Sequence, residues 1–219
     1  MKRKRTSSKR IYRIAKRAAR NTGELKFYDY GNQGAIWTPS WTGDIDNIAD
    51  NIAVGNQQTN RIGSTVRFKG IRFSFIITGN DAHPYPDSHV RIVVCRGHAE
   101  NAVAFTWTDV NQELGNNLAI VSPKRFNRFK KFTIYYDKTF HVGSGWLTIP
   151  GAGNPPGLPG IPFKKIVKTY IPLNYNIRYD VAATATIMDG GLYVMAISDN
   201  ADISRASVEF HTRLYFHDS

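Results

Sequence analysis

The chain has 219 residues, of which 29 are Lys or Arg and 17 are Asp or Glu, so its net charge is +12. Its single cysteine, Cys95, excludes an intrachain disulfide and therefore a small disulfide-stapled secreted scaffold. No apolar run approaches the ~18 residues of a membrane span, and the N-terminus lacks the apolar stretch of a secretory signal. We therefore expect a soluble protein, made inside the cell, with no membrane insertion.

The positive charge is concentrated at the N-terminus. Ten basic residues and no acidic residue occur within positions 1–20, which leaves 19 basic and 17 acidic residues for the rest of the chain. This distribution predicts a basic arm over residues 1–23 and a nearly neutral body over residues 24–219. Concentrated cations are typical of segments that bind a polyanion, because neutralising phosphates releases counterions without requiring a shaped site. The alternative is a tail that only improves solubility, a role that added acidic residues serve better.

Part of the arm has helical spacing. The apolar positions that share one stripe of this helix are Ile11, Ile14, Ala15, Ala18 and Ala19. Residues 1–8 are polar and are expected to be disordered, so the arm is predicted to be partly helical. The cations of the arm predicted to bind nucleic acid are Lys2, Arg3, Lys4, Arg5, Lys9, Arg10, Arg13, Lys16, Arg17 and Arg20.

The body has the period-two pattern of β-strands from residue 64 onward. Residues 24–62 show no sustained period, and we expect an irregular linker there. The predicted strands cover residues 64–79, 89–97, 131–142, 163–173, 176–187, 191–199 and 206–218. In the first of them the apolar alternation slips between Phe68 and Ile71, which predicts a β-bulge at Gly70.

The alternation also predicts which side chains face the core. Residues 131–142 are predicted to place Phe132, Ile134, Tyr136, Phe140 and Val142 on one face. Residues 206–218 are predicted to bury Val208, Phe210, Leu214 and Phe216. The stretch 191–199 reads as buried on both faces, and Asp109 is expected to cap a short helix that closes at Gly115.

These strands predict an all-β protein, and their number and uneven connections favour an eight-stranded jelly-roll sandwich. The connection over residues 143–162 has five Pro and six Gly, so it is expected to be a long loop. Its apolar residues, Trp146, Leu147, Ile149 and Ile161, are expected to contact neighbouring copies of the chain.

The stretch "QQTNRIGSTVRFKGIRFSF" resembles the start of the jelly roll in small icosahedral capsid proteins. The similar proteins are those of circular single-stranded DNA viruses (circovirus-like and geminivirus-like) and of satellite tobacco necrosis virus. The resemblance continues through "HVRIVVCRG", "TWTDVNQEL" and "KRFNRFKKFTIYYDKTF", and so covers residues 57–142 by motif. A basic, partly helical arm ahead of the sandwich belongs to the same pattern.

The resemblance implies a closed shell of about sixty copies whose arms point inward. Roughly 600 arm charges would then face the packaged nucleic acid, independently of its sequence. Circular single-stranded DNA is the genome that the resemblance favours, although RNA stays open. The cluster Lys2–Arg5 with Lys9 and Arg10 also fits the loose pattern of a nuclear import signal, so a host import receptor is a candidate partner, as is a cell-surface receptor. The expected locations are the virion and, during assembly, the host nucleus or cytoplasm.

A second basic segment, "KRFNRFKK", interleaves cations with Phe126 and Phe129, an arrangement that can stack on bases while pairing with phosphates. Its candidate nucleic-acid-binding residues are Lys124, Arg125, Arg128, Lys130 and Lys131. The alternative is that the phenylalanines belong to the core and the cations to a solvated strand edge. The lysines Lys164, Lys165 and Lys168 are further candidates.

Metal and catalytic sites are not indicated. The calcium loop that could include Asp44, Asp46 and Asp50 lacks the required glycine and glutamate. The histidines His83, His89 and His98 lack the spacing of a zinc site. Cys95 lies in an apolar run, which favours a buried, unreactive thiol. We therefore expect no cofactor, no metal and no enzymatic activity.

The sequence thus predicts a viral capsid protein that self-assembles and packages nucleic acid through its arm. One alternative is a cellular single-stranded nucleic-acid-binding protein with a basic tail. Another is a jelly-roll enzyme or lectin, which would need a cluster of metal-ligating histidines.

Overall fold

The structure is a computed structural model that describes residues 12, 24–32, 37–40, 43–79, 88–98, 106–111, 120–121, 123–124, 131–142, 164–180, 187–199 and 206–218. Within these residues the chain is mostly β-strand and forms two antiparallel sheets, which confirms the predicted all-β sandwich. Among them no helix has the length and apolarity to cross a membrane.

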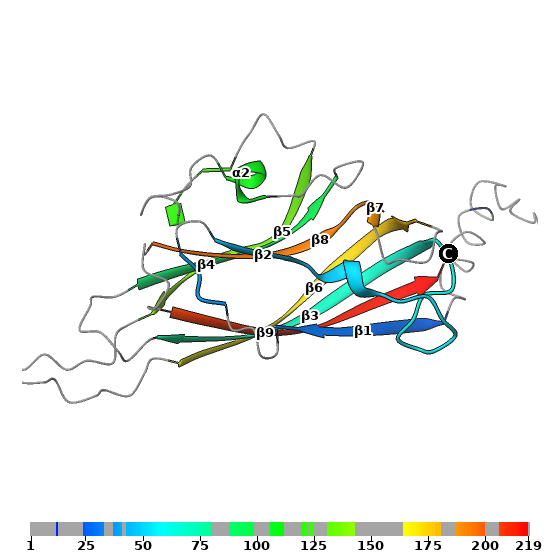
Figure 1. The fold of residues 1–219 in the computed structure, drawn as a ribbon, viewed down its shortest axis with the longest axis horizontal. Coiled ribbons are helices and arrows are strands. Elements are labelled where there is room, and N and C mark those ends of the chain that lie inside the picture. The colour runs from blue at the N-terminus through cyan, green and yellow to red at the C-terminus, as the bar shows by residue number, and fades with distance from the viewer. Residues whose placement is uncertain are drawn as a thin grey trace, which may run out of the picture.

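The strands, in chain order, are β1 (Leu25–Gly31), β2 (Asp44–Asn47), β3 (Thr65–Gly79), β4 (Ser88–Gly97), β5 (Phe132–Val142), β6 (Lys164–Tyr179), β7 (Ile187–Asp189), β8 (Leu192–Ser198) and β9 (Ala206–Asp218). The 3-10 helix η1 (Ile48–Asn51) follows β2, and helix α2 (Trp107–Val110) follows β4. Sheet 1 has the strand order β1-β9-β3-β6-β7, and sheet 2 has the order β2-β8-β4-β5. Figure 1 shows the two sheets stacked, with α2 on the side of sheet 2 that faces away from sheet 1.

The strand pairs are nested along the sequence. Strand β1 pairs with β9, β2 with β8, β3 with β6, and β4 with β5, all antiparallel. Each pair therefore lies inside the sequence span of the pair before it, as in one long hairpin folded over on itself. Two further pairings, β3 with β9 and β4 with β8, join the nested pairs into the two sheets.

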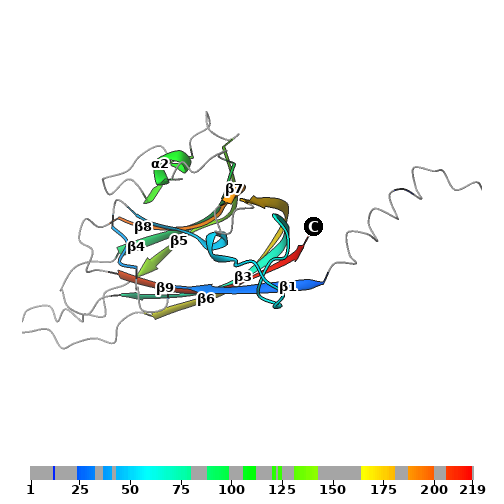
Figure 2. The ribbon, with the colours of Figure 1, turned by 45° about the vertical axis from the view of Figure 1, so that its right-hand side comes forward.

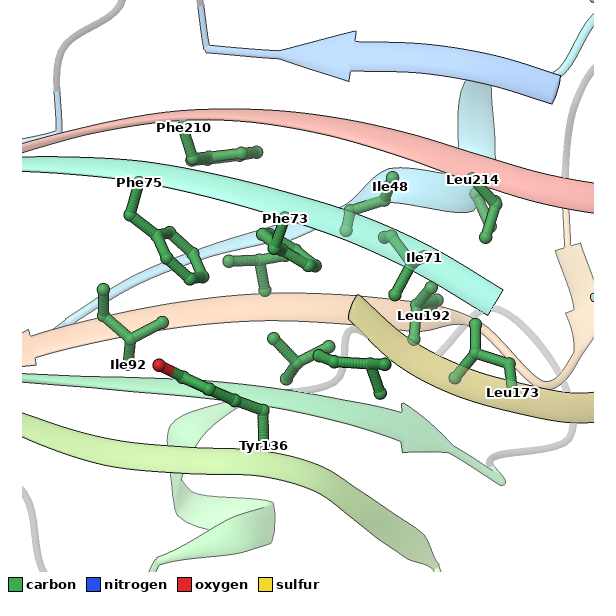
Figure 3. Close-up of a cluster of buried hydrophobic side chains, with 14 of the residues drawn as sticks. Ile48, Ile71, Phe73, Phe75, Ile92, Tyr136, Leu173, Leu192, Phe210 and Leu214 are labelled. Atoms are coloured by element: carbon green, nitrogen blue, oxygen red, sulfur yellow. The ribbon is translucent and has the colours of Figure 1, made fainter. Parts of the chain in front are cut away.

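The hydrophobic core lies between the sheets. The inward side chains of β3 include Phe73 and Phe75, which are fully buried and have ring centroids 4.8 Å apart. The ring centroid of Phe210 in β9 lies 6.3 Å from that of Phe73, and the ring centroid of Tyr136 in β5 lies 6.0 Å from that of Phe75. Both sheets therefore contribute aromatic rings to the core (Figure 3). Each large apolar side chain removed from water stabilises the fold by roughly 1.5–3 kcal/mol.

The predicted bulge in the first long strand is confirmed. The register of β3 against both β6 and β9 shifts between Phe68 and Gly70. As a result Phe68 and Ile71, three positions apart, are both fully buried. The inward set predicted for residues 206–218 is also confirmed, and β8 is buried on both faces as expected.

A second bulge escaped the sequence analysis. The register of β4 against β5 shifts between Val94 and Cys95, which pair with Tyr136 and Ile134, so Tyr135 is the extra residue. Phe132 and Ile134 therefore do not share the core face with Tyr136, Phe140 and Val142, as the alternation predicted. They pack instead on the outer side of sheet 2.

Residues 24–62 are not the irregular linker that the sequence indicated, because they contain β1, β2 and η1. Strand β1 pairs over its whole length with β9, from Leu25 opposite His217 to Gly31 opposite His211. Its alternation is hard to recognise because one inward position is the charged Lys26. Strand β2 is four residues long, too short to show a period. The long strand expected to open the sandwich, β3, is consequently the third in chain order.

The turn before β3 is held by a buried arginine. Arg61 is 2% exposed, and its guanidinium donates hydrogen bonds from Nε to the Ile52 carbonyl and from Nη1 to the Gly63 carbonyl, at 3.2 and 2.8 Å. It also lies 4.2 Å from the ring centroid of Tyr179 at the end of β6. Arg61 therefore fixes the entry to β3 by contacts within the protein.

Helix α2 begins three residues before the position that the sequence indicated. Thr106 is the N-cap, and Asp109 is the third helical residue, whose Oδ2 accepts hydrogen bonds from Thr106 N and Oγ1, both at 3.0 Å. The prediction that Asp109 caps the helix is therefore wrong, because Asp109 reaches back to the cap as in a capping box. Gly115, the expected helix end, lies outside the described residues.

Helix α2 covers the outer face of sheet 2. Its buried residues, Trp107 and Val110, belong to a second apolar cluster, which is formed with Val93, Cys95, Ile120, Phe132, Met195 and Ile197. The Trp107 indole Nε1 donates a hydrogen bond to the Asp44 carbonyl at 3.2 Å, which ties α2 to the start of β2. The outer side of sheet 2 is thus a second, smaller hydrophobic layer.

Gly43 is the residue that this contact depends on. Its φ is +70°, and a Cβ at this position would overlap the Trp107 indole, including Cε2 at 2.9 Å. We expect Gly43→Ala to lower the free energy of unfolding by about 2 kcal/mol or more, measured by urea denaturation. Gly55→Ala is the matched control, because its Cβ would meet only the flexible Asn60 side chain and its φ is not positive. Equal stabilities of the two variants would contradict the assigned role of Gly43.

Candidate nucleic-acid interface

The predicted arm joins the sandwich at the start of β1. Of residues 1–23 the structure describes Tyr12, which is helical and 65% exposed, and the ten arm cations lie outside the described residues. Leu25, the first residue of β1, pairs with His217 near the end of β9, so the first strand begins beside the end of the last strand, at one end of sheet 1 (Figure 2).

A buried lysine anchors this junction. Lys26 is 2% exposed, and its Nζ lies 2.8 Å from Asp218 Oδ2 and donates a hydrogen bond to the Asn60 carbonyl at 2.9 Å. Taking an ammonium group out of water is unfavourable unless it is paired, and here a carboxylate and a carbonyl supply the partners. Lys26 therefore differs from the arm cations: it holds β1 to β9 and to the loop before β3.

The second predicted basic segment is described at two of its five cations. Arg125, Arg128 and Lys130 lie outside the described residues. Lys131 is exposed at the turn before β5, and its carbonyl accepts a hydrogen bond from His98 N at 2.6 Å. Lys124 is 38% exposed, and its Nζ lies 3.1 Å from Asp137 Oδ2, so its charge is already paired within the protein.

Lys124 belongs to a charge cluster that the sequence analysis missed. Arg91 of β4 donates two parallel hydrogen bonds to Asp137 of β5, from Nε and Nη2, each at 2.9 Å. Its Nη1 donates a third to the Ile120 carbonyl at 3.3 Å. Since Arg91 is 6% exposed, this geometry compensates the cost of burying its charge. The signal in the sequence was an arginine within the apolar run of residues 89–97.

The cluster sets the protonation of Asp137. Burial raises the pKa of this carboxyl, but the hydrogen bonds and charge of Arg91, followed by those of Lys124, outweigh it and leave the pKa below its ordinary value. Asp137 is therefore ionised at neutral pH and fastens Lys124, in the connection between β4 and β5, to the outer face of sheet 2. This interaction is structural, and it makes Lys124 a weaker phosphate ligand than Lys131.

The lysines at the start of β6 point in two directions. Lys165 pairs with Ile77, which is an inward residue, whereas Lys164 and Lys168 occupy the alternate positions, which face away from sheet 2. All three are exposed. Lys164 and Lys168 thus lie on the outer face of sheet 1, and Lys165 lies where the core ends.

Of the residues weighed as metal ligands, His83 lies outside the described residues, and two of the others have partners within the protein. Asp46 accepts a hydrogen bond from the Tyr30 hydroxyl, and His89 Nδ1 lies 2.9 Å from Asp199 Oδ2. Within the described ranges no three His, Cys, Asp or Glu side chains gather as a metal site. Cys95 is fully buried, as predicted; burial raises the pKa of its thiol far above neutrality, so its reactive thiolate form is suppressed.

Comparisons with known proteins do not identify a family. No family model and no curated protein matches this chain. A function must therefore be argued from the charge distribution, the strand order and the surfaces of the sandwich.

The Arg91–Asp137 pair makes a stability prediction. Asp137→Ala leaves the Arg91 guanidinium buried without its carboxylate, and we expect a loss of about 3–5 kcal/mol in the free energy of unfolding, measured by urea denaturation. Asp189→Ala is the control, because Asp189 is 43% exposed and lies 4.0 Å from Arg96, which makes its ion pair worth less than about 1 kcal/mol. Equal losses of unfolding free energy in the two variants would show that the buried Arg91–Asp137 pair is not a stabilising element.

The same carboxylate makes a pH prediction. Because the pKa of Asp137 is lower in the folded protein than the ~3.9 of an unfolded aspartate, its stabilising effect is complete above about pH 4. It is lost as the pH falls through the folded-state pKa. The difference in unfolding free energy between the native chain and Asp137→Ala should accordingly shrink from pH 7 to pH 3. A difference that stays constant across this range would contradict the assignment.

Proposed function

We propose that this chain is a viral capsid protein that self-assembles into a small icosahedral shell and packages a nucleic-acid genome through its basic arm. The observation that carries the proposal is the separation of charge: ten cations and no acidic residue in positions 1–20, ahead of a nearly neutral β-sandwich. A shell subunit needs one part that packs against its copies and another that neutralises phosphates, and this chain divides along that line.

The strand order supports a jelly roll. When the short β7 is set apart, the described strands pair first with last, second with second-last, third with sixth and fourth with fifth. This nesting is what results when one long antiparallel hairpin is rolled into two packed sheets, the architecture of many viral capsid and lectin domains. It supports the jelly-roll prediction independently of the motifs in residues 57–142.

The placement of the arm supports packaging. It enters the sandwich at the start of β1, and the buried Lys26–Asp218 pair fixes that point at one end of sheet 1. In a symmetric shell every copy would therefore deliver its arm at an equivalent place. About sixty copies would bring roughly 600 positive charges to one enclosed strand, a sequence-independent means of condensing it.

The proposed partners follow from this role. They are further copies of the chain and a packaged nucleic acid, for which circular single-stranded DNA is proposed ahead of RNA. The cluster Lys2–Arg5 with Lys9 and Arg10 also fits the loose pattern of a nuclear import signal, so a host import receptor is proposed as a transient partner. The locations that follow are the virion and, during assembly, the host nucleus or cytoplasm.

The proposal is tested by expressing the full chain and a variant in which the ten arm cations are replaced by Gln. We expect the native chain to form closed particles in electron micrographs and to co-purify with nucleic acid, which nuclease digestion types as DNA or RNA. The Gln variant should lose the nucleic acid, because the counterion release that drives packaging is removed. A control in which the four arm lysines, Lys2, Lys4, Lys9 and Lys16, are replaced by Arg keeps the charge and should package normally.

Two outcomes would contradict the proposal. A native chain that stays monomeric at every salt concentration, with and without nucleic acid, would instead favour a cellular single-stranded nucleic-acid-binding protein. A Gln variant that packages as much nucleic acid as the native chain would show that the arm is not the packaging element.

A further inference from the structure

The outer face of sheet 1 differs in character from the outer face of sheet 2. Its strands expose alternate residues, and among the described residues no segment packs over it as α2 packs over sheet 2. Tyr170 and Ile166 of β6, for example, are 55% and 57% exposed. The register of β1, β9, β3 and β6 decides which residues lie side by side on this face. Residues paired across the four strands are called a row here.

One row across these strands is aromatic and apolar. It joins Phe27 of β1, Tyr215 of β9, Gly70 of β3 and Pro172 of β6, which are paired in that order. Tyr170 extends from the next row of β6 toward the same place, because its hydroxyl lies over Gly70, where a Cβ would overlap it. Its ring centroid is 6.4 Å from that of Tyr215. The bulge glycine thus leaves space for Tyr170 beside Tyr215.

Cationic rows lie on both sides of the aromatic row. On one side, Arg67 lies opposite His217. On the other side, Arg72 lies between Arg213 and Tyr170 in one row, and Lys168 lies one row further, opposite Ser74. Consecutive rows are about 7 Å apart, the spacing of alternate residues in a strand. Phe27 and Tyr215 therefore lie between Arg67 on one side and Arg72 and Arg213 on the other, and Tyr170 lies beside Arg72.

Few carboxylates neutralise this surface. Asp29 is held by two hydrogen bonds from Arg213, each 2.7 Å, and Glu209 lies two rows from Arg72. Within the described residues no ion pair engages Arg72 or Lys168, both of which are exposed. The guanidinium of Arg213 also lies 4.6 Å from the ring centroid of Phe27, so a cation and a ring already share one site.

An exposed ring, Tyr170, with the half-buried rings of Phe27 and Tyr215 and cations beside them, is suited to one class of ligand. Single-stranded nucleic acid offers base faces that stack on aromatic side chains and phosphates that pair with Lys and Arg, and sheet surfaces are used in this way. A duplex hides its base faces, and an acidic protein partner would use the cations but not the rings. The combination of rings and cations is the observation that selects the occupant.

We infer that the outer face of sheet 1 binds single-stranded nucleic acid, with Phe27, Tyr170 and Tyr215 stacking on bases and Arg67, Arg72 and Lys168 contacting phosphates. The inference deepens the proposed function and rests on it for the source of the strand, which is the packaged genome. It also assigns an orientation to the subunit, because the face that touches the genome must be the inner face of the shell.

The site is mapped by ultraviolet crosslinking of the full chain to an oligomer of thymidine nucleotides, followed by mass spectrometry of the crosslinked peptides. We expect crosslinks to Tyr170, Tyr215 or Phe27 in addition to those in the arm. Crosslinks confined to the arm would overturn the inference. Particles that contain nucleic acid but lack the sheet crosslinks would leave the proposed function intact, whereas sheet crosslinks without any particles would leave the binding face and remove the capsid role.

Stacking is tested with paired variants and paired ligands. We expect Tyr170→Ala to bind the thymidine oligomer about five-fold more weakly or worse, and to bind an abasic oligomer of equal length as the native chain does. Ile166→Ala is the matched control on the same strand and face, and it should change neither affinity. Gly70→Ala should act like Tyr170→Ala, because its Cβ displaces the Tyr170 hydroxyl without removing a charge or a ring. If Tyr170→Ala weakened both ligands equally, or neither, stacking on this face would be refuted.

The phosphate contacts are tested by salt dependence. Lys168→Ala should reduce the slope of log affinity against log salt by about 0.7, the value for one contact to a single strand. Lys138→Ala removes an equally exposed lysine from β5 of sheet 2 and should leave the slope unchanged. Identical slopes for the two variants would place the phosphates elsewhere than on sheet 1.

Discussion

The pairing of β1 with β9 is the constraint that the rest of the molecule depends on. It brings the first and last described strands together over seven residue pairs and places β9 between β1 and β3. Without it sheet 1 would end at β9, whose other neighbour is β3, and Phe210 would lose the ring of Tyr30 beside it. The Lys26–Asp218 pair strengthens the same junction, next to the point where the basic arm of residues 1–23 joins β1. Fold, arm position and outer surface are thus set by one register.

The two sheets use their outer faces in different ways for physical reasons. Sheet 2 carries Val93, Cys95 and Met195 outward, and such a surface is unstable in water until α2 and its neighbours cover it. Arg91 and Asp137 are then buried with it and must satisfy one another. Sheet 1 carries alternating polar, charged and ring-bearing residues outward, which tolerate water and stay accessible. The outer face of sheet 2 is therefore covered and contributes to stability, and the outer face of sheet 1 is the one proposed to contact a ligand.

The sequence was sufficient for β3 and β9 and insufficient for whatever depends on register. The longest strand, β6, was wrongly predicted as two strands, over residues 163–173 and 176–187, because Pro172 and Asn174 interrupt its pattern. Alternation over β3 and β9 predicted their inward side chains, and the odd step at Gly70 predicted a bulge, because glycine marked it. The bulge at Tyr135 went unrecognised because the residues around it are all apolar or aromatic, so either face satisfied the pattern. Strand β1 was missed because one of its inward positions is the charged Lys26, and β2 because it has four residues; both pair with partners more than 140 residues away.

The candidate interface shows the same limit. The arm is continuous in sequence, so composition was enough to propose it, but its cations lie outside the described residues and stay a prediction. The surface of sheet 1 combines residues from position 27 to position 217, which become neighbours only through strand pairing. No local pattern groups Phe27 with Tyr170 and Tyr215. Conversely, the sequence indicated Lys124 as a candidate phosphate ligand but contained no sign of its ion pair with Asp137.

The shape of β2 has a consequence for how copies of this chain can meet. At the end of the strand order of sheet 2, as far as that sheet is described, β2 offers four residues, two of them aspartates. A foreign strand docking there would gain few main-chain hydrogen bonds and would lie against negative charge, which are the features that blunt fibre growth along sheet edges. Association through this border is disfavoured, so in the proposed shell neighbouring copies would join through other parts of the sandwich.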